Sequence, residues 1–143
     1  MPTPYSFSSD LSVIDRELVH RWLSEQSYWA QGRSRETQEA AMEASRNYCV
    51  LDADGRQVAY ARVVTDGVTF AWLCDVFVDE KSRGHGVGAI LVEGVVDDLR
   101  RFSTVRRIML ATQGAEGLYA KYGFTPPPGP TSYMIKSMER ERS

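Results

Sequence analysis

The stretch DVFVDEKSRGHGVG, Asp75 to Gly88, runs from an apolar segment into a loop with three glycines within five residues. Glycine loses more backbone freedom on folding than any other residue, so glycines at this density need a structural or a functional reason. Two interpretations are open at this point: a plain connection between a strand and a helix, or a loop whose backbone a ligand approaches. The stretch AILVEGVVDDL that follows predicts an amphipathic helix beginning at the loop.

A helix beginning at Gly86–Gly88 would present the unpaired N–H groups of its first turn and the positive end of its dipole, which together suit phosphate. Glycines let that backbone approach an anion without an intervening Cβ, and Arg83 can add charge-assisted hydrogen bonds. The loop lacks the Lys-Ser/Thr pair of a P-loop and the glycine spacing of a dinucleotide fingerprint. An anion site of another kind is therefore the functional interpretation.

The chain upstream of the loop predicts two helices and three strands. Apolar residues four apart indicate a helix over Ser12–Glu25, with Ser12 as its cap and Asp15 in its first turn. A second, more polar helix is expected over Arg35–Ser45. Segments rich in β-branched and aromatic residues, separated by turn signals, predict an antiparallel meander over residues 48–52, 57–64 and 68–78.

Downstream of the glycine-led helix, we expect a strand over residues 105–110, a short helix over 115–123 that ends at Gly123 as its cap, and an edge strand over 131–138. With a first strand near the N-terminus, the order is β-α-α-β-β-β-α-β-α-β. The fold class is therefore α/β, with a mixed sheet.

The length, net charge and composition of the sequence exclude several classes of function. The 143 residues predict one domain over residues 1–143, and a net charge of −2 argues against a nucleic-acid or membrane partner. The first residues resemble no secretory signal, and no apolar run could span a bilayer, so we expect a cytoplasmic protein. Cys49 and Cys74 are expected to stay reduced, and no Cys/His spacing predicts a metal site.

Two motifs together point to a family. Arg83-x-x-Gly86-x-Gly88 after VFVDEKS resembles the central motif of the GCN5-related N-acetyltransferases, the GNAT superfamily, and GLYAKYGF, Gly117–Phe124, resembles its second signature. The motifs lie about thirty residues apart with a helix and a strand between them, and the resemblance covers essentially the whole chain. SYWAQGRSRE and LCDVFV further resemble small bacterial members. The resemblance implies the GNAT fold with splayed central strands, and acetyl-CoA as co-substrate.

The resemblance also implies the residues that contact the cofactor. The loop amides would bind the pyrophosphate, and pantetheine would pair with the strand at Val76–Val78. Thr112 stands where many members have a cofactor-contacting Asn, but it could equally be the N-cap of the last helix. His85 is either a loop residue or a phosphate neighbour. The expected cofactor-binding residues are Val76, Phe77, Val78, Arg83, Gly84, His85, Gly86, Val87, Gly88, Thr112 and Tyr119.

Acetyl transfer to an amine needs a group that protonates the leaving thiolate and a group that takes the amine's proton. Tyr119 occupies the family position near the thioester sulfur, so it is the expected general acid; the alternative is a core aromatic, as is expected of Tyr122. The strand position where some members carry a glutamate base is Trp72 here. Asp75 is the one carboxylate within the strand, and it could act as base, orient the substrate ammonium, or serve structure.

The acceptor site is expected at Ser27–Ser34, between the first two helices. Tyr28 and Trp29 offer flat walls with polar tips, and Arg33 or Arg35 could hold a carboxylate, with the amine near Asp75. The alternative is that both aromatics extend the core face of the first helix. The expected substrate is a primary amine of a small molecule or peptide.

Direct transfer in a ternary complex is favoured over covalent catalysis, because neither cysteine has a base evident in the sequence. A non-catalytic acyl-CoA-binding module is the main alternative function, followed by a purely structural or interaction domain. A homodimer is left open.

Overall fold

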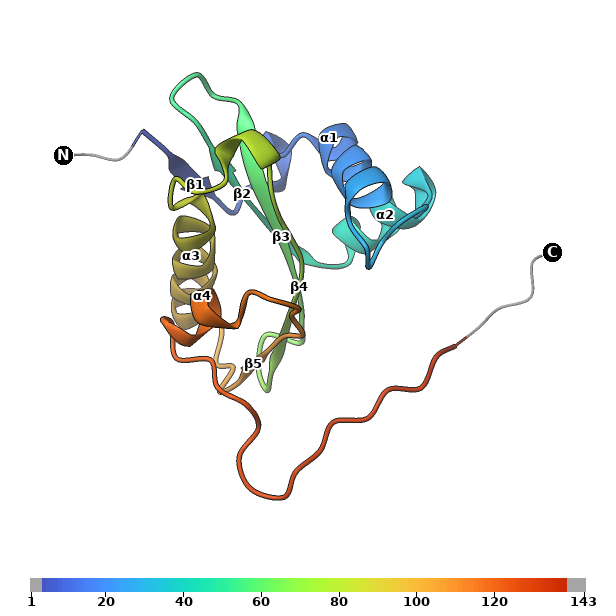
Figure 1. Ribbon diagram of the computed structural model, residues 1–143, viewed down its shortest axis with the longest axis vertical. Coiled ribbons are helices and arrows are strands. Elements are labelled where there is room, and N and C mark those ends of the chain that lie inside the picture. The colour runs from blue at the N-terminus through green and yellow to red at the C-terminus, as the bar shows by residue number, and fades with distance from the viewer. Residues whose placement is uncertain (1–3, 139–143) are drawn as a thin grey trace.

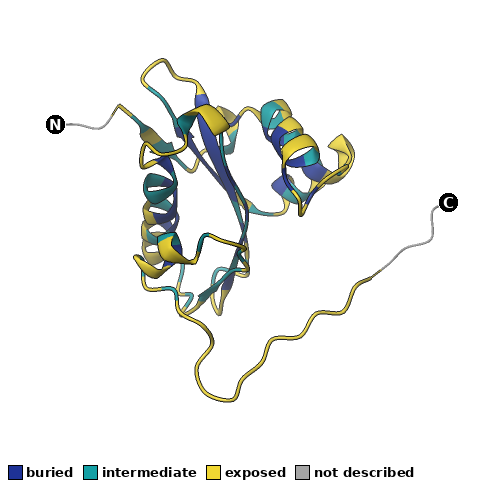
Figure 2. Cartoon of the chain, in the orientation of Figure 1, coloured by how far each residue is buried: buried dark blue, intermediate teal, exposed yellow. Residues whose placement is uncertain are grey.

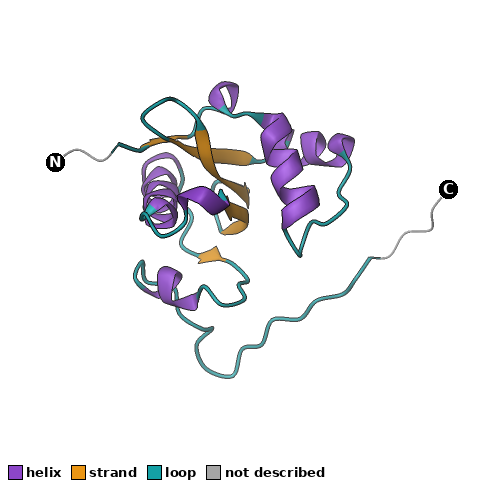
Figure 3. Ribbon diagram, turned by 45° about the horizontal axis from the view of Figure 1, so that its top comes forward, coloured by secondary structure: helices purple, strands orange, loops and turns teal. Residues whose placement is uncertain are grey.

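A mixed five-stranded sheet forms the centre of the molecule. The computed structural model describes residues 4–138. Its strands stand in the order β1-β2-β3-β4-β5, antiparallel from β1 to β4 and parallel between β4 and β5. The α/β class with a mixed sheet is thereby confirmed (Figure 3). The strands are β1 Ser6–Ser8, β2 Arg46–Leu51, β3 Gln57–Thr65, β4 Ala71–Val78 and β5 Ile108–Met109.

Helices cover both faces of the sheet. Helices α1 (Arg16–Arg21) and α2 (Arg35–Glu43) lie on one face, and α3 (Val87–Phe102) and α4 (Glu116–Ala120) lie on the other (Figure 1). Two buried clusters result, one between the sheet and α3 and one between the sheet and the first two helices. The middle strands carry most of the burial (Figure 2).

Strand β4 changes face at a bulge. Leu73 belongs to the cluster with α3, whereas Phe77 belongs to the cluster with α1, although residues four apart in a regular strand point the same way. The register between β3 and β4 shifts between Tyr60 and Arg62, and Asp75 is the one non-glycine residue of 4–138 with positive φ, at 52°. The bulge thus aims Asp75 toward α1 and α2, because an extra residue re-aims the side chains around it.

Strands β4 and β5 part after two residue pairs. Ala71 pairs with Ile108 and Trp72 with Met109, and β4 then continues to Val78 with no further pairing to β5. The chain beyond Met109 leaves the sheet toward α4. The predicted splay of the central strands is therefore present, and it leaves one edge of the second half of β4 open.

The first predicted helix is broken into three pieces. A 3-10 turn at Leu11–Val13 precedes α1, and a π-helical turn at Trp22–Gln26 follows it. The expectation that Ser12 caps this helix is wrong, since the Asp15 carboxylate accepts the N–H of Leu18 and so forms the N-cap. Asp15 directly precedes the first residue of α1, where a side-chain oxygen can accept a first-turn N–H. Its negative charge also interacts favourably with the positive end of the helix dipole.

The predicted edge strand over residues 131–138 is absent from the described structure. This segment is exposed and pairs with no strand among residues 4–138. Prolines 126, 127, 128 and 130 precede it, and proline cannot donate to a ladder. Strand β5, the outer strand of the sheet, is also only two residues long and offers little edge to extend.

Close packing of α3 on β1 gives a stability prediction. A Cβ at Gly94 would collide with the ring of Phe7, which itself stacks on Tyr48. We expect Gly94→Ala to lower the free energy of unfolding by about 1–3 kcal/mol, as overpacking does, in spite of alanine's better helix propensity. Gly117→Ala in α4 is the matched control, because its Cβ meets nothing within 4 Å. A denaturant titration that finds both variants equally stable would contradict this packing.

Candidate active site

The glycine loop ends in a helix N-terminus without a side-chain cap. Gly84 and Gly86 have φ of 83° and 80°, and Gly86 is the N-cap of α3. An added Cβ at either residue would meet no heavy atom within 4 Å, so the surface over the loop is open. The first-turn N–H groups at Val87 and Gly88 therefore lie where an anion can reach the backbone.

Gly88 serves packing as well. A Cβ there would stand 3.4 Å from the Leu118 side chain of α4. The absence of a side chain thus lets α4 lie close to the first turn of α3. Of the three loop glycines, two are needed for left-handed backbone and one for the approach of a neighbouring helix.

Arg83 ties the loop to β4. Its Nε donates to the Val78 carbonyl at 3.0 Å, and its guanidinium carbon lies 5.4 Å from the centre of the Phe77 ring. Phe77 stacks in turn on Trp22 of the π-helical turn, at 5.3 Å between ring centres. The terminal nitrogens of this exposed arginine have no partner among residues 4–138. His85 is also exposed, and the structure adds no role for it.

The second motif fixes Tyr119 through a helix cap. Gly123 has φ of 89°, the N–H of Phe124 donates to the Tyr119 carbonyl at 3.2 Å, and the N–H of Gly123 donates to the Ala120 carbonyl. These two bonds form a Schellman motif, and the Tyr119 and Phe124 rings make the apolar contact that accompanies it, at 5.8 Å. The predicted glycine cap is confirmed, and it explains the Gly-Phe of the motif.

Tyr119 is buried but its hydroxyl makes no hydrogen bond within the described chain. Burial raises the pKa of Tyr119, and the phenol of Tyr28 lies near enough to raise it further. The hydroxyl therefore keeps its proton through the neutral range. Tyr122 packs partly buried against the same cluster, in line with its expected packing role.

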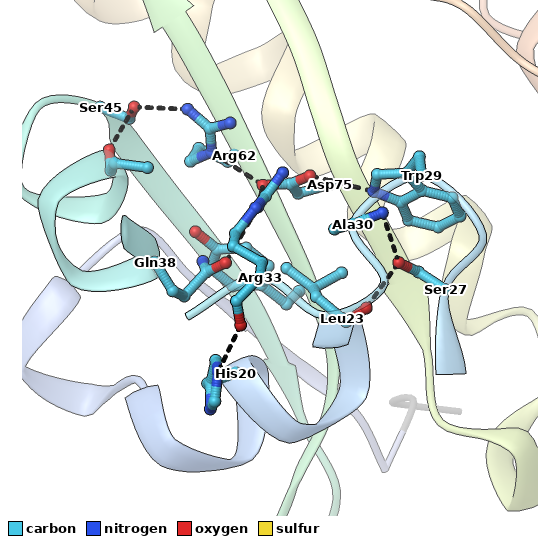
Figure 4. A network of polar contacts seen from close by, with 12 residues as sticks. His20, Leu23, Ser27, Trp29, Ala30, Arg33, Gln38, Ser45, Arg62 and Asp75 are labelled. Carbon is cyan, nitrogen blue, oxygen red and sulfur yellow. Dashed lines mark hydrogen bonds and ion pairs between the residues drawn. The ribbon is translucent and has the colours of Figure 1, made fainter. Parts of the chain in front are cut away.

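The predicted acceptor segment is a loop pinned at several backbone points (Figure 4). It leaves the π-helical turn at Ser27, whose hydroxyl donates to the Leu23 carbonyl and accepts the N–H of Ala30. The ring of His20 contacts the Arg33 carbonyl at 2.8 Å. These contacts hold the loop against the first helix, while Tyr28 and Trp29, 63% and 42% exposed, stay outside the core. The alternative of a continued core face is therefore wrong.

Asp75 accepts hydrogen bonds at both carboxylate oxygens. Oδ1 accepts from Nε1 of Trp29 at 3.0 Å, and Oδ2 accepts from Nη1 of Arg33 at 2.8 Å and from Nε of Arg62 at 2.9 Å. The loop and β3 thus meet at the bulge of β4 (Figure 4).

The arginines govern the ionisation of Asp75. Burial by itself would raise the pKa, but the hydrogen bond from Arg33 and the charges of Arg62 and Arg33 outweigh it, and the pKa of Asp75 lies below its ordinary value. A general base works best with a pKa near the operating pH. The lowered pKa, together with the three hydrogen bonds that the carboxylate already accepts, favours an orienting role for Asp75 over a basic one.

The structure connects the predicted acceptor-side residues with one another. Tyr28 interacts electrostatically with Tyr119, its ring meets the Trp29 ring edge-on at 5.0 Å, and Nε1 of Trp29 donates to Asp75. Thr112 is half-exposed in the loop before α4 and makes no side-chain hydrogen bond within residues 4–138. Its alternative as N-cap of α4 is wrong, because that position is Ala115.

Arg62 and Gln38 belong to this site and were not singled out from the sequence. Arg62 is the charge within the apolar run VAYARVV of β3, the same signal that identified Asp75. Gln38 accepts from Nη1 of Arg33 through Oε1 and is 1% exposed. Gln38 was not predicted because its sequence neighbours in α2 are also polar, and nothing in that helix's sequence marks Gln38 as buried.

Two kinds of site are not found among residues 4–138. No group of three or more His, Cys, Asp or Glu side chains there is arranged to hold a metal ion. None of the helices described combines the length and the apolar character that crossing a membrane requires.

The family assignment follows from comparison with known proteins. A family model described as the acetyltransferase (GNAT) family matches residues 16–124, which includes the glycine loop and the Tyr119 motif. The chain belongs to the GNAT acetyltransferase family. A solved GNAT-family protein from Xanthomonas campestris pv. campestris is 41% identical with a TM-score of 0.86, and the match covers 96% of this chain and 95% of that one.

Two further matches cover different shares of the chain. Serotonin N-acetyltransferase 2, chloroplastic, from Oryza sativa subsp. japonica is 36% identical over 74 residues, 52% of this chain. The chain matches 37% of the length of the curated relatives compared. Rv2747 from Mycobacterium tuberculosis, solved in complex with CoA, shares the fold with a TM-score of 0.71 at 19% identity, over 89% of this chain and 76% of that one. GNAT proteins use acyl-CoA.

Proposed function

We propose that this GNAT protein is an acetyl-CoA-dependent N-acetyltransferase that passes the acetyl group directly to a primary amine of a small molecule or peptide. The observation that carries the proposal is the hydroxyl of the buried residue Tyr119, which has no hydrogen-bond partner within residues 4–138 and interacts electrostatically with Tyr28 of the acceptor loop. A phenol in that setting is free to serve a substrate. A module that only binds acyl-CoA has no need of it.

The residues at the glycine loop fit the co-substrate. Open space over Gly84 and Gly86 and the missing side-chain cap of α3 suit a pyrophosphate on the amides of Val87 and Gly88. The terminal N–H groups of Arg83 can add hydrogen bonds to it, and His85 and Thr112 would border the cofactor. The open edge of β4 at Val76–Val78 offers backbone groups to pantetheine.

Acetyl-CoA supplies the acetyl group as a thioester. The amine nitrogen forms the new bond to the acetyl carbon while the carbon–sulfur bond breaks. Tyr119 donates its proton to the departing sulfur and regains one from solvent, and the amine's proton leaves to water. Asp75 and the loop residues Tyr28, Trp29 and Arg33 orient the acceptor.

The proposed activity is tested by incubating the protein with acetyl-CoA and a panel of amines while a thiol reagent reports free CoA. We expect thiol release that depends on both the protein and an amine. CoA that binds without amine-dependent release for any amine would instead support the non-catalytic acyl-CoA-binding module.

Direct transfer predicts that no acetyl-enzyme accumulates. Burial raises the pKa of both Cys49 and Cys74 to about 11, so these thiols stay protonated and weakly nucleophilic at neutral pH. Intact-protein mass spectrometry after incubation with acetyl-CoA alone should show the unmodified mass. A stoichiometric acetyl group on either cysteine that is passed on to an added amine would overturn direct transfer.

A further inference from the structure

The acceptor side of the site holds an unbalanced charge cluster. Asp75, 4% exposed, is the one carboxylate bonded to both Arg33 and Arg62, whose side chains are 20% and 14% exposed. Two guanidinium groups on one carboxylate leave a net charge of +1 in a largely desolvated place. An isolated charge is costly to bury, so a cluster with one cation in excess favours a bound anion.

The two arginines also have hydrogen-bond donors to spare. Arg33 uses Nη1 on Gln38 and Asp75, and Arg62 uses Nε on Asp75 and Nη1 on Ser45. Nε and Nη2 of Arg33 and Nη2 of Arg62 have no partner among residues 4–138. A guanidinium carries five N–H groups in a planar fork that matches the two oxygens of a carboxylate.

Gln38 supplies an independent observation. It is 1% exposed, and its Nε2 is the buried side-chain nitrogen that lacks a hydrogen-bond partner within the described chain. Its Oε1 is bonded to Arg33, so this unpaired amide lies in the same cluster. A buried donor without a partner is destabilising, which is the signature of a group that a ligand or water completes.

Two aromatic side chains of the acceptor loop link the cluster to the proposed general acid. Trp29, which donates to Asp75, touches Tyr28, and Tyr28 interacts electrostatically with the proposed general acid Tyr119. An acceptor held by the cluster would need to extend past these two aromatic side chains to bring its amine to Tyr119. The net charge of +1 matches a carboxylate, which carries one negative charge, better than a phosphate monoester.

We propose that Arg33, Arg62 and Gln38 bind a free carboxylate of the acceptor, so that the substrates are amines of the amino-acid type. This inference rests on the proposed acetyl transfer and names its substrate class. Asp75 acts in it as a positioning residue that aligns the two guanidinium groups. Arg62, on the middle strand β3 of the sheet, is the specificity-determining member.

Matched acceptors test the inference. Amino acids are compared with their carboxamides and with amines that carry a phosphate monoester in place of the carboxylate, each with acetyl-CoA and wild-type protein. We expect kcat/KM to favour the carboxylate form by about 10- to 100-fold, the range for hydrogen bonds to a charged group. Equal use of acid and amide, or a preference for the phosphorylated amines, would overturn the carboxylate assignment while leaving acetyl transfer intact.

Variants refine this test. Arg62→Gln should raise KM for the acids and leave KM for the amides within about twofold, so that the preference disappears, and Arg62→Lys should restore it in part. Arg46→Gln is the control, because Arg46 pairs with the buried Asp98 away from the site. We expect Arg46→Gln to keep the preference for the acids over the amides. An Arg62→Gln effect equal on acids and amides would contradict the inference, and the wild-type comparison stands even if Arg62→Gln fails to fold.

Binding measurements distinguish the proposed carboxylate site from the proposed acetyl transfer. Thermal shifts of the CoA-loaded protein with each member of a pair report carboxylate recognition without turnover. Protection by the acids but not the amides, with no acetylation of either, would support the anion site and refute the transferase proposal. Acetylation of acids and amides at equal rates would instead support the transferase proposal and refute the carboxylate site.

Discussion

Gly86→Glu is expected to weaken CoA binding by about 100-fold or more without unfolding the protein. Gly86 caps α3 with a φ of 80°, and the space over it is open, so a side chain there enters the volume assigned to the pyrophosphate. Glutamate adds a negative charge next to that anion. Each lost hydrogen bond to a charged group costs about 1.5–3 kcal/mol, and about 1.4 kcal/mol is tenfold in affinity.

The matched control is Gly55→Glu. Gly55 also has a φ of 80° and no heavy atom within 4 Å of a built Cβ, but it lies in the turn between β2 and β3. Both variants carry the same backbone strain, of about 1–2 kcal/mol. Isothermal titration with CoA should therefore separate them sharply. Unchanged affinity in folded Gly86→Glu would remove the pyrophosphate from this loop.

Tyr119→Phe is expected to lower kcat by about 10²- to 10⁴-fold, the usual contribution of a general acid. The hydroxyl makes no hydrogen bond within the described chain, so phenylalanine preserves the packing against Phe124 and the dissociation constant for CoA should hardly change. Because burial raises the pKa of Tyr119, the wild-type group stays protonated across the neutral range, and the loss should appear at every neutral pH.

Tyr122→Phe provides the comparison for that loss. Tyr122 follows Tyr119 by three residues, packs against the same cluster and has no expected chemical role. Its kcat should stay within about twofold of wild type. Single-turnover rates would show whether chemistry limits turnover; equal rates for Tyr119→Phe and wild type under that condition would make Tyr119 a packing residue.

The sequence predicted the elements whose local signals agree with their surroundings. The glycine loop, α3 and the cap at Gly123 follow from apolar periodicity and from backbone positions that only glycine occupies easily. The meander of β2, β3 and β4 follows from β-branched runs divided by turn signals. In each case, local propensity and burial favour the same structure.

Prediction from the sequence was wrong where contacts with distant parts of the chain determine the local structure. The segment over residues 131–138 has strand-like composition, but a strand needs an edge to pair with, and β5 is too short to provide one. The N-cap of α1 is Asp15 and not Ser12, because Ser12 lies within a separate 3-10 turn that Asp10 caps. Neither outcome is encoded in a window of neighbouring residues.

The candidate site was predictable in its members but not in its contacts. Tyr28, Trp29, Arg33 and Asp75 were each expected to serve the acceptor, yet the bulge that joins them could not be predicted. A positive φ at an aspartate has no reliable sequence signal. Arg62 carries the same sequence signal as Asp75, a charge within an apolar strand, but its pairing with Asp75 is recognisable only once β3 and β4 are in register.

A crystal structure of the protein with acetyl-CoA tests the central claim most directly. The account predicts the pyrophosphate on the backbone amides of Val87 and Gly88, pantetheine along the open edge of β4, and the thioester sulfur within hydrogen-bond reach of the Tyr119 hydroxyl. Acetyl-CoA bound elsewhere, or with its sulfur out of reach of Tyr119, would contradict it.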